Sequence, residues 1–178
     1  MTSRKNLIAV IGLAMGAVFG MSGSFVADPT LTGILYEISS IGLIFALALL
    51  TIKYIKEDDD YRATGFLLFA IGEAAMSVGT ASGEIAGQSA FAAGMAIYVP
   101  ALLFISLPKG FPSWVRFTGI AATIPFAIAA ATIFTGGQVL GSSPIAGAAY
   151  GLLVITIVGW CLSLLREGKV AQTSQAFA

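Results

Sequence analysis

Four polar residues stand at helical spacing in a stretch of the chain that is otherwise apolar. They are Glu73, Ser77, Thr80 and Glu84. Their offsets of 4, 7 and 11 residues place them on one face of an α-helix. If that helix crosses a membrane from Ala63, a rise of about 1.5 Å per residue puts Glu73 roughly 15 Å deep, near the midplane. A charge at that depth costs about 2.5–3.5 kcal/mol, so we expect Glu73 either to be protonated or to face water, a cation or a polar partner.

A second carboxylate, Glu37, lies roughly 9 Å below the outer membrane boundary by the same rise, with Ser40 one turn deeper. The deeper halves of both segments are apolar on every face, as in the run from Leu43 to Leu50. This one-sided polarity predicts a polar cavity that is open to the outside and closed below the midplane. The candidate residues for binding a solute or ion are Glu73, Glu37, Ser77, Thr80, Ser40, Tyr36, Tyr98 and Tyr150. A purely structural alternative is that the two glutamates only form hydrogen bonds between helices.

The elements that must carry these residues are membrane-spanning helices. The chain has 178 residues, of which 57% are hydrophobic and 10% charged, and its mean hydropathy is +0.93, whereas soluble domains carry about 25% charged residues. A helix needs about 20 apolar residues to cross a membrane, and β-barrel strands would show alternating segments of about ten residues. The sequence therefore predicts an all-α integral membrane protein with a single transmembrane domain over 1–169 and a disordered polar tail over 170–178. The six spans of the predicted bundle are about 6–26, 31–52, 63–82, 87–107, 116–136 and 143–165.

The nine basic residues gather in four clusters, separated by long stretches without Lys or Arg. The clusters are Arg4/Lys5, Lys53/Lys56/Arg62, Lys109/Arg116 and Arg166/Lys169. Basic residues accumulate in cytoplasmic loops, so the N- and C-termini are both expected in the cytoplasm. We expect a multi-pass protein of a prokaryotic cytoplasmic (inner) membrane. For the first span a cleaved signal peptide is an alternative, because the basic pair, the apolar run and Ser22-Gly23-Ser24 also fit that pattern.

The six spans pair into three tandem helical hairpins whose sequences resemble one another. Arg62-Ala-Thr-Gly65 opens the second hairpin and Arg116-Phe-Thr-Gly119 opens the third, and the return helices carry Tyr36, Tyr98 and Tyr150. A threefold repeat would place these tyrosines at similar depth around one axis. The alternative is that apolar helices drawn from a small set of residue types look alike by chance.

Glycines at four-residue spacing line one face of several spans. Such faces let helices approach closely in a lipid environment that provides no hydrophobic drive for association. The pattern fits packing within one bundle, which we favour, and it also fits an interface with a second copy or with a membrane partner subunit. The helix-packing candidates are Gly12, Gly16, Gly20, Gly79, Gly83, Gly147 and Gly151.

The chain contains no histidine and only one cysteine, Cys161. This composition excludes histidine-ligated haem and zinc sites and Ser–His chemistry, and one cysteine gives no metal-binding spacing. The sequence also contains no glycine-rich phosphate loop and no basic patch suited to nucleic acid. We therefore expect no enzymatic activity, no cofactor, no metal site and no nucleic-acid partner.

Two functions fit the sequence. The first is transport or binding of a small solute or ion through the cavity that contains Glu73 and Glu37. The alternative is a non-catalytic structural or assembly subunit of a larger membrane complex, with the glycine faces as docking surfaces. In size, span count and cytoplasmic termini the chain resembles the substrate-binding subunits of energy-coupling-factor transporters, a resemblance of architecture without a shared motif. The expected partners are the lipid bilayer, a small solute or cation, and a second copy or partner subunit.

Overall fold

Each apolar segment of the chain forms one helix, because only a helix satisfies all backbone hydrogen bonds within a single segment in lipid. The computed structural model describes the backbone of residues 3–176 and the side chains of residues 6–168. Within that range the chain forms six helices and no strands, which confirms the all-helical prediction. All six helices are long and apolar enough to cross a membrane, which supports a multi-pass membrane protein. The helices are α1 (Ser3–Gly23), α2 (Pro29–Ile55), α3 (Asp60–Ser82), α4 (Gln88–Ser106), α5 (Ser113–Phe134) and α6 (Pro144–Ala176).

The observed helix bounds differ from the hydropathy spans mainly where polar residues cap or extend a helix. Asp28 caps α2 by accepting a hydrogen bond of 2.7 Å from the backbone N–H of Leu31, and Pro29 occupies the first turn, where its fixed φ and missing N–H are tolerated. The helix therefore begins two residues before the predicted span. At the other end of the chain, α6 is assigned to Ala176. The disorder expected of the tail 170–178 stays a prediction, and 177–178 lie outside the described residues.

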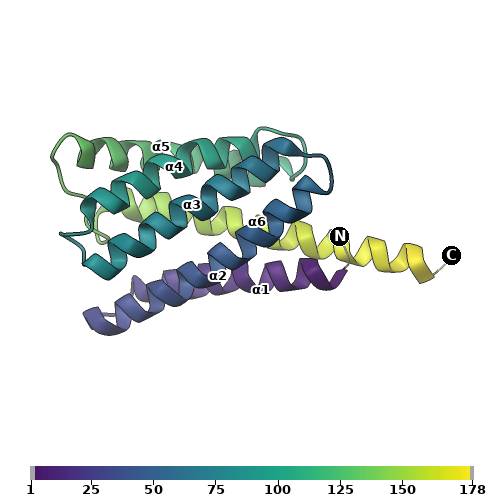
Figure 1. Cartoon of the computed structure of the whole chain (residues 1–178), viewed down its shortest axis with the longest axis horizontal. Helices are drawn as coiled ribbons and strands as arrows, with labels where there is room; N and C mark the ends of the chain where they lie inside the picture. The colour runs from purple at the N-terminus through teal and green to yellow at the C-terminus, as the bar shows by residue number, and fades with distance from the viewer. Residues whose placement is uncertain (1–2, 177–178) are drawn as a thin grey trace.

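The six helices form a closed ring in which each helix packs along its neighbours in sequence and α6 returns to α1 (Figure 1). The middle of the ring is filled by aromatic side chains. Trp160 of α6 meets Phe66 and Phe69 of α3 edge-on, with ring centroids 5.2 and 5.9 Å apart, and also contacts Phe111. Large rings of this kind fill the space that a ring of helices would otherwise leave open.

Both chain ends lie at the same end of the bundle (Figure 1), which we call the basic end; the turns after α1, α3 and α5 form the opposite end. At the basic end Lys53 is only 3% exposed and pairs with Glu57 at 2.9 Å and with Glu167 of α6 at 3.1 Å. The cationic groups of Lys53 and Arg62 each lie 4.3 Å from the centre of the Tyr54 ring, within the range of cation–π attraction. These contacts join α2, α3 and α6 and close this end of the ring.

The carboxylate of Asp59 caps α3 at the same end. It accepts hydrogen bonds from the backbone N–H of Arg62 at 3.0 Å and from the Arg62 guanidinium at 2.6 Å. Burial opposes ionisation of this carboxyl, but the two hydrogen bonds and the positive charge of Arg62 outweigh it and lower the pKa of Asp59. The cap therefore stays ionised at neutral pH and fixes the start of α3.

The glycines of α1 lie against α2 within the same chain. A Cβ added at Gly12 would meet the carbonyl oxygen of Gly42 at 2.6 Å, and one added at Gly20 would meet the Ser39 hydroxyl at 3.0 Å. A Cβ at Gly16, between them, would overlap the Leu43 side chain. Close backbone approach of α1 and α2 therefore depends on these three glycines.

The remaining glycine candidates lie in different surroundings. Gly79 packs under the ring of Phe91, and Gly83 ends α3 with a φ of 88°, a conformation that L side chains rarely adopt. Gly147 and Gly151 of α6 would meet no atom within 4 Å of an added Cβ. Packing at these two positions therefore stays a prediction that involves another molecule.

The contrast gives a matched pair of substitutions. Gly12→Ala should destabilise the protein by about 1–3 kcal/mol, because the new methyl group overlaps backbone rather than a movable side chain. Gly147→Ala adds the same atom where space is open and should leave stability unchanged or slightly higher. Thermal unfolding of both variants in one detergent would test this, and equal losses would show that α1 and α2 are not packed as described.

Candidate functional site

Glu73 lies inside the bundle between two hydroxyl groups from neighbouring helices. Ser40 of α2 donates a hydrogen bond of 2.6 Å to Oε1, and Tyr98 of α4 donates to Oε2. The Glu73 side chain is 6% exposed. Both carboxyl oxygens therefore have a partner, as a buried polar group requires.

The position of Tyr98 follows from the small residues around it. A Cβ added at Gly72 would lie 2.7 Å from the Tyr98 ring, and one at Gly94 would lie 2.8 Å from the carbonyl oxygen of Gly72. The tyrosine ring is also held edge-on by Phe69 at 4.4 Å and by Phe126 at 5.1 Å. Close approach of α3 and α4 thus brings the hydroxyl to Glu73 and leaves the ring no room to move away.

This arrangement can hold a carboxyl group in either protonation state. The hydroxyls of Ser40 and Tyr98 can donate hydrogen bonds or accept them, so the same contacts suit a carboxylate or a carboxylic acid. Glu73 does not line the groove described next. Its carboxyl group is enclosed by the bundle and makes no direct contact with that groove.

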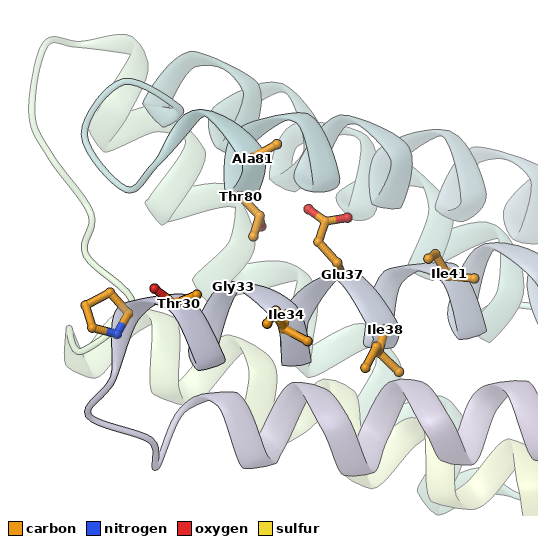
Figure 2. Close-up of a pocket in the computed structure, with 9 residues that line it drawn as sticks. Thr30, Gly33, Ile34, Glu37, Ile38, Ile41, Thr80 and Ala81 are labelled. Atoms are coloured by element: carbon orange, nitrogen blue, oxygen red, sulfur yellow. The ribbon is translucent and has the colours of Figure 1, made fainter.

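Glu37 lies in a groove of about 430 Å³ between α2 and α3, toward the opposite end of the bundle (Figure 2). Its carboxyl group points from α2 toward α3, on the side of Thr80 (Figure 2). The groove is lined by Pro29, Thr30, Gly33, Ile34, Glu37, Ile38, Ile41, Thr80 and Ala81.

One oxygen of Glu37, Oε1, is buried and has no hydrogen-bond partner among the described residues. Thr80 supplies no donor to it, because its hydroxyl donates to the carbonyl oxygen of Met76 at 3.2 Å. An orphaned carboxyl oxygen costs free energy unless a proton, a cation or a donor from a bound molecule satisfies it. Because Oε1 is itself screened from the groove, the groove offers the carboxyl group of Glu37 as a whole, and this one oxygen stays without a partner in the described part of the chain.

The two carboxyl groups are connected through α2. Glu37 precedes Ser40 by three residues, which is a rise of about 4.5 Å along the same helix face, and Ser40 donates to Glu73. Glu37, Ser40 and Glu73 thus follow one another from the groove into the bundle. A change of charge at one carboxyl group acts on the other at short range.

In the part of the chain that the structure describes, the other sequence candidates form no hydrogen bond with either carboxyl group, although Tyr150 packs on the same Phe126 ring as Tyr98. The Tyr36 hydroxyl is 3.3 Å from the exposed hydroxyl of Ser24, and its ring packs on Gly23. Tyr150 is 36% exposed and meets Phe126 edge-on at 5.4 Å. Ser77 is half-buried on α3 and does not line the groove.

The structure therefore groups the candidates in two sets. Ser40 and Tyr98 gather around Glu73, and Thr80 accompanies Glu37. Each of the three repeat tyrosines contacts the first helix of its own hairpin, but the hydroxyl of Tyr98 alone is bonded to a carboxyl group among the described residues. The threefold repeat stays a prediction.

The sequence analysis missed the aliphatic walls of the groove. A signal for them was present, because Pro29, Gly33, Glu37 and Ile41 stand at strict four-residue spacing and so share one face of α2. This face of α2 carries the acid Glu37, the open position at Gly33 and the branched side chain of Ile41. No group of three or more His, Cys, Asp or Glu residues suited to a metal ion occurs in the described part of the chain.

Comparisons with protein families, with curated proteins and with solved structures find no match to this chain. The function of the site is therefore inferred from its own geometry and chemistry.

The contacts of Glu73 can be tested by making the same substitution, Tyr to Phe, at two positions. Tyr98→Phe should lower the free energy of unfolding by about 1–3 kcal/mol, because it leaves a buried carboxyl oxygen without its donor. Tyr36→Phe removes a hydroxyl that faces the exposed Ser24 and should change stability by less than about 0.5 kcal/mol. Unfolding of both variants would be followed in the same detergent. A Tyr98→Phe protein as stable as Tyr36→Phe would contradict the described bond.

Proposed function

We propose that this multi-pass membrane protein binds and transports a small solute or ion through the groove between α2 and α3. Glu37 contacts the ligand, and Glu73 lies behind it as an enclosed proton site. The observation that carries the proposal is that Glu37, whose Oε1 is buried without a partner in the described part of the chain, is the one ionisable residue lining a groove of about 430 Å³. This size is within the range of about 300–1,000 Å³ typical of ligand pockets. The proposal assigns no catalytic step to the chain.

The two ends of the bundle differ in a way that supports binding from one side. The basic end is closed by the ion pairs of Lys53 and by aromatic rings, including Tyr54 and Phe66, which stack at 5.4 Å. The groove lies toward the other end. Because Lys and Arg favour the cytoplasmic side, the proposal places both termini in the cytoplasm of a prokaryotic cell and the groove toward the outside.

The second carboxyl group gives the proposal a means of coupling. When a cation leaves Glu37, the negative charge left there acts through space on Glu73, and a proton on Glu73 relieves the repulsion. Intramembrane acids commonly serve transport in this manner. A site with a single acid would lack this exchange.

Native mass spectrometry of the protein, extracted gently from its own membrane, tests the proposal. A small-molecule or ion mass should accompany the natural protein and be lost from Glu37→Gln, which removes the charge in the groove. Glu84→Gln is the matched control, because Glu84 lies at the same end of the bundle, outside the groove, where Oε1 accepts a bond of 2.7 Å from the N–H of Gly141. The same bound mass on all three proteins would reject a role for Glu37.

A second function, that of a docking subunit, is supported by one observation. Gly147 and Gly151 lie one turn apart on α6 and meet no atom of the chain within 4 Å. Small residues on an otherwise unpacked helix face allow the backbone of another helix to approach.

Gly151→Leu tests the docking function. The leucine should detach a stoichiometric partner protein, or a second copy, that co-purifies with the natural chain. Leu162→Ala is the control for a general change of that helix surface, because it shortens an exposed side chain closer to the C-terminal end of α6. A Gly151→Leu protein that retains every partner would argue against docking at this face.

A further inference from the structure

The lining of the groove combines one ionisable side chain with aliphatic walls. Of the described residues that line it, Glu37 alone is ionisable, and Ile34, Ile38 and Ile41 supply branched apolar surface. The Oε1 atom of Glu37 has no hydrogen-bond partner in the described part of the chain. A ligand that complements this surface carries one positive charge and an apolar body.

A bare metal ion does not match these groups. Hard cations such as Ca²⁺ and Mg²⁺ take about six or more oxygen ligands, whereas the lining offers the carboxyl group of Glu37 and the hydroxyls of Thr30 and Thr80. Aliphatic walls cannot replace the water molecules that such an ion would lose. The chemistry of the lining thus favours a cation that needs few oxygen ligands.

The rim of the groove faces the region that lipid would occupy. Ile34 and Ile41 are 51% and 64% exposed although they lie in a membrane-spanning helix. Near the start of α2, a Cβ added at Gly33 would meet no atom within 4 Å, so space is left in the groove one turn before Glu37. A ligand that partitions into the bilayer can reach Glu37 from the side.

We infer that the groove binds an organic monocation with apolar substituents, a tertiary or quaternary ammonium, whose charge lies against Glu37. The inference rests on the proposed function and names its ligand class. Attraction between the ammonium and the carboxylate is stronger in this low-dielectric surrounding than in water. The alkyl groups pack on Ile34 and Ile41 in the place that lipid chains would otherwise occupy.

Isothermal titration of the purified chain in lipid nanodiscs with tetrapropylammonium chloride tests the inference, with sodium chloride at equal ionic strength as the reference. The natural protein should bind tetrapropylammonium, and Glu37→Gln should bind it at least about tenfold more weakly. Gly33→Leu keeps the charge but fills the open space, and should also weaken binding by about tenfold. Glu84→Gln removes a carboxylate outside the groove and should bind like the natural protein.

The outcomes separate the inference from the proposed function. If Na⁺ or another inorganic cation binds in a Glu37-dependent manner and tetrapropylammonium does not, the ligand class is wrong while the proposed site stands. If tetrapropylammonium binds equally to the natural protein, Glu37→Gln and Gly33→Leu, it partitions into lipid and the inference fails. If no cation binds in a Glu37-dependent manner and the extracted protein carries no bound mass, both proposals fall.

Discussion

The constraint on which the structure depends is that an acid inside an apolar bundle must find hydrogen-bond donors. Glu73 obtains them from α2 and α4 at once, through Ser40 and Tyr98. Its two bonds therefore fix the relative positions of three helices as well as the protonation chemistry of one residue. In hydrocarbon, where apolar contact between helices gains little over contact with lipid, such polar contacts specify which helices lie together and at what height.

Those bonds exist because glycines let the helices approach. Gly72 and Gly94 bring the backbones of α3 and α4 close enough for the Tyr98 ring to lie flat against α3. The glycines of α1 do the same for α2, which carries both Ser40 and Glu37. The small residues and the acids therefore depend on one another. The glycines set the distances between the helices, and at those distances the hydroxyl groups of Ser40 and Tyr98 reach Glu73.

The sequence was sufficient to predict the helices, because hydropathy and helical spacing depend only on neighbouring residues. It also allowed a polar partner for Glu73, but it placed that residue in an open cavity and not inside the bundle. It did not predict that Tyr98, rather than Tyr36 or Tyr150, bonds to Glu73. That choice depends on how α3 and α4 are aligned, which the contacts at Gly72 and Gly94 decide. The sequence also led to the prediction of one cavity that contains both Glu37 and Glu73. That prediction used depth along the membrane, which does not show which side of a helix is enclosed.

The hydrogen bonds of the fold account for the burial of Glu73 but not for that of Oε1 of Glu37. Glu73 needs no ligand to account for it, since both of its oxygens are bonded and its removal would leave two buried hydroxyls unpaired. Glu37 makes no such contribution through Oε1, which is buried at a cost and stabilises nothing in the described part of the chain. Sequence analysis gave Glu73 the leading role because it is deeper, but depth measures only the cost of burial. Within the described residues, buried polar atoms without a partner also occur in Asn6, Tyr54, Ser106 and Trp160. Among these residues Glu37 alone lines the groove, and that position, more than the cost of burial, marks it as the candidate ligand contact.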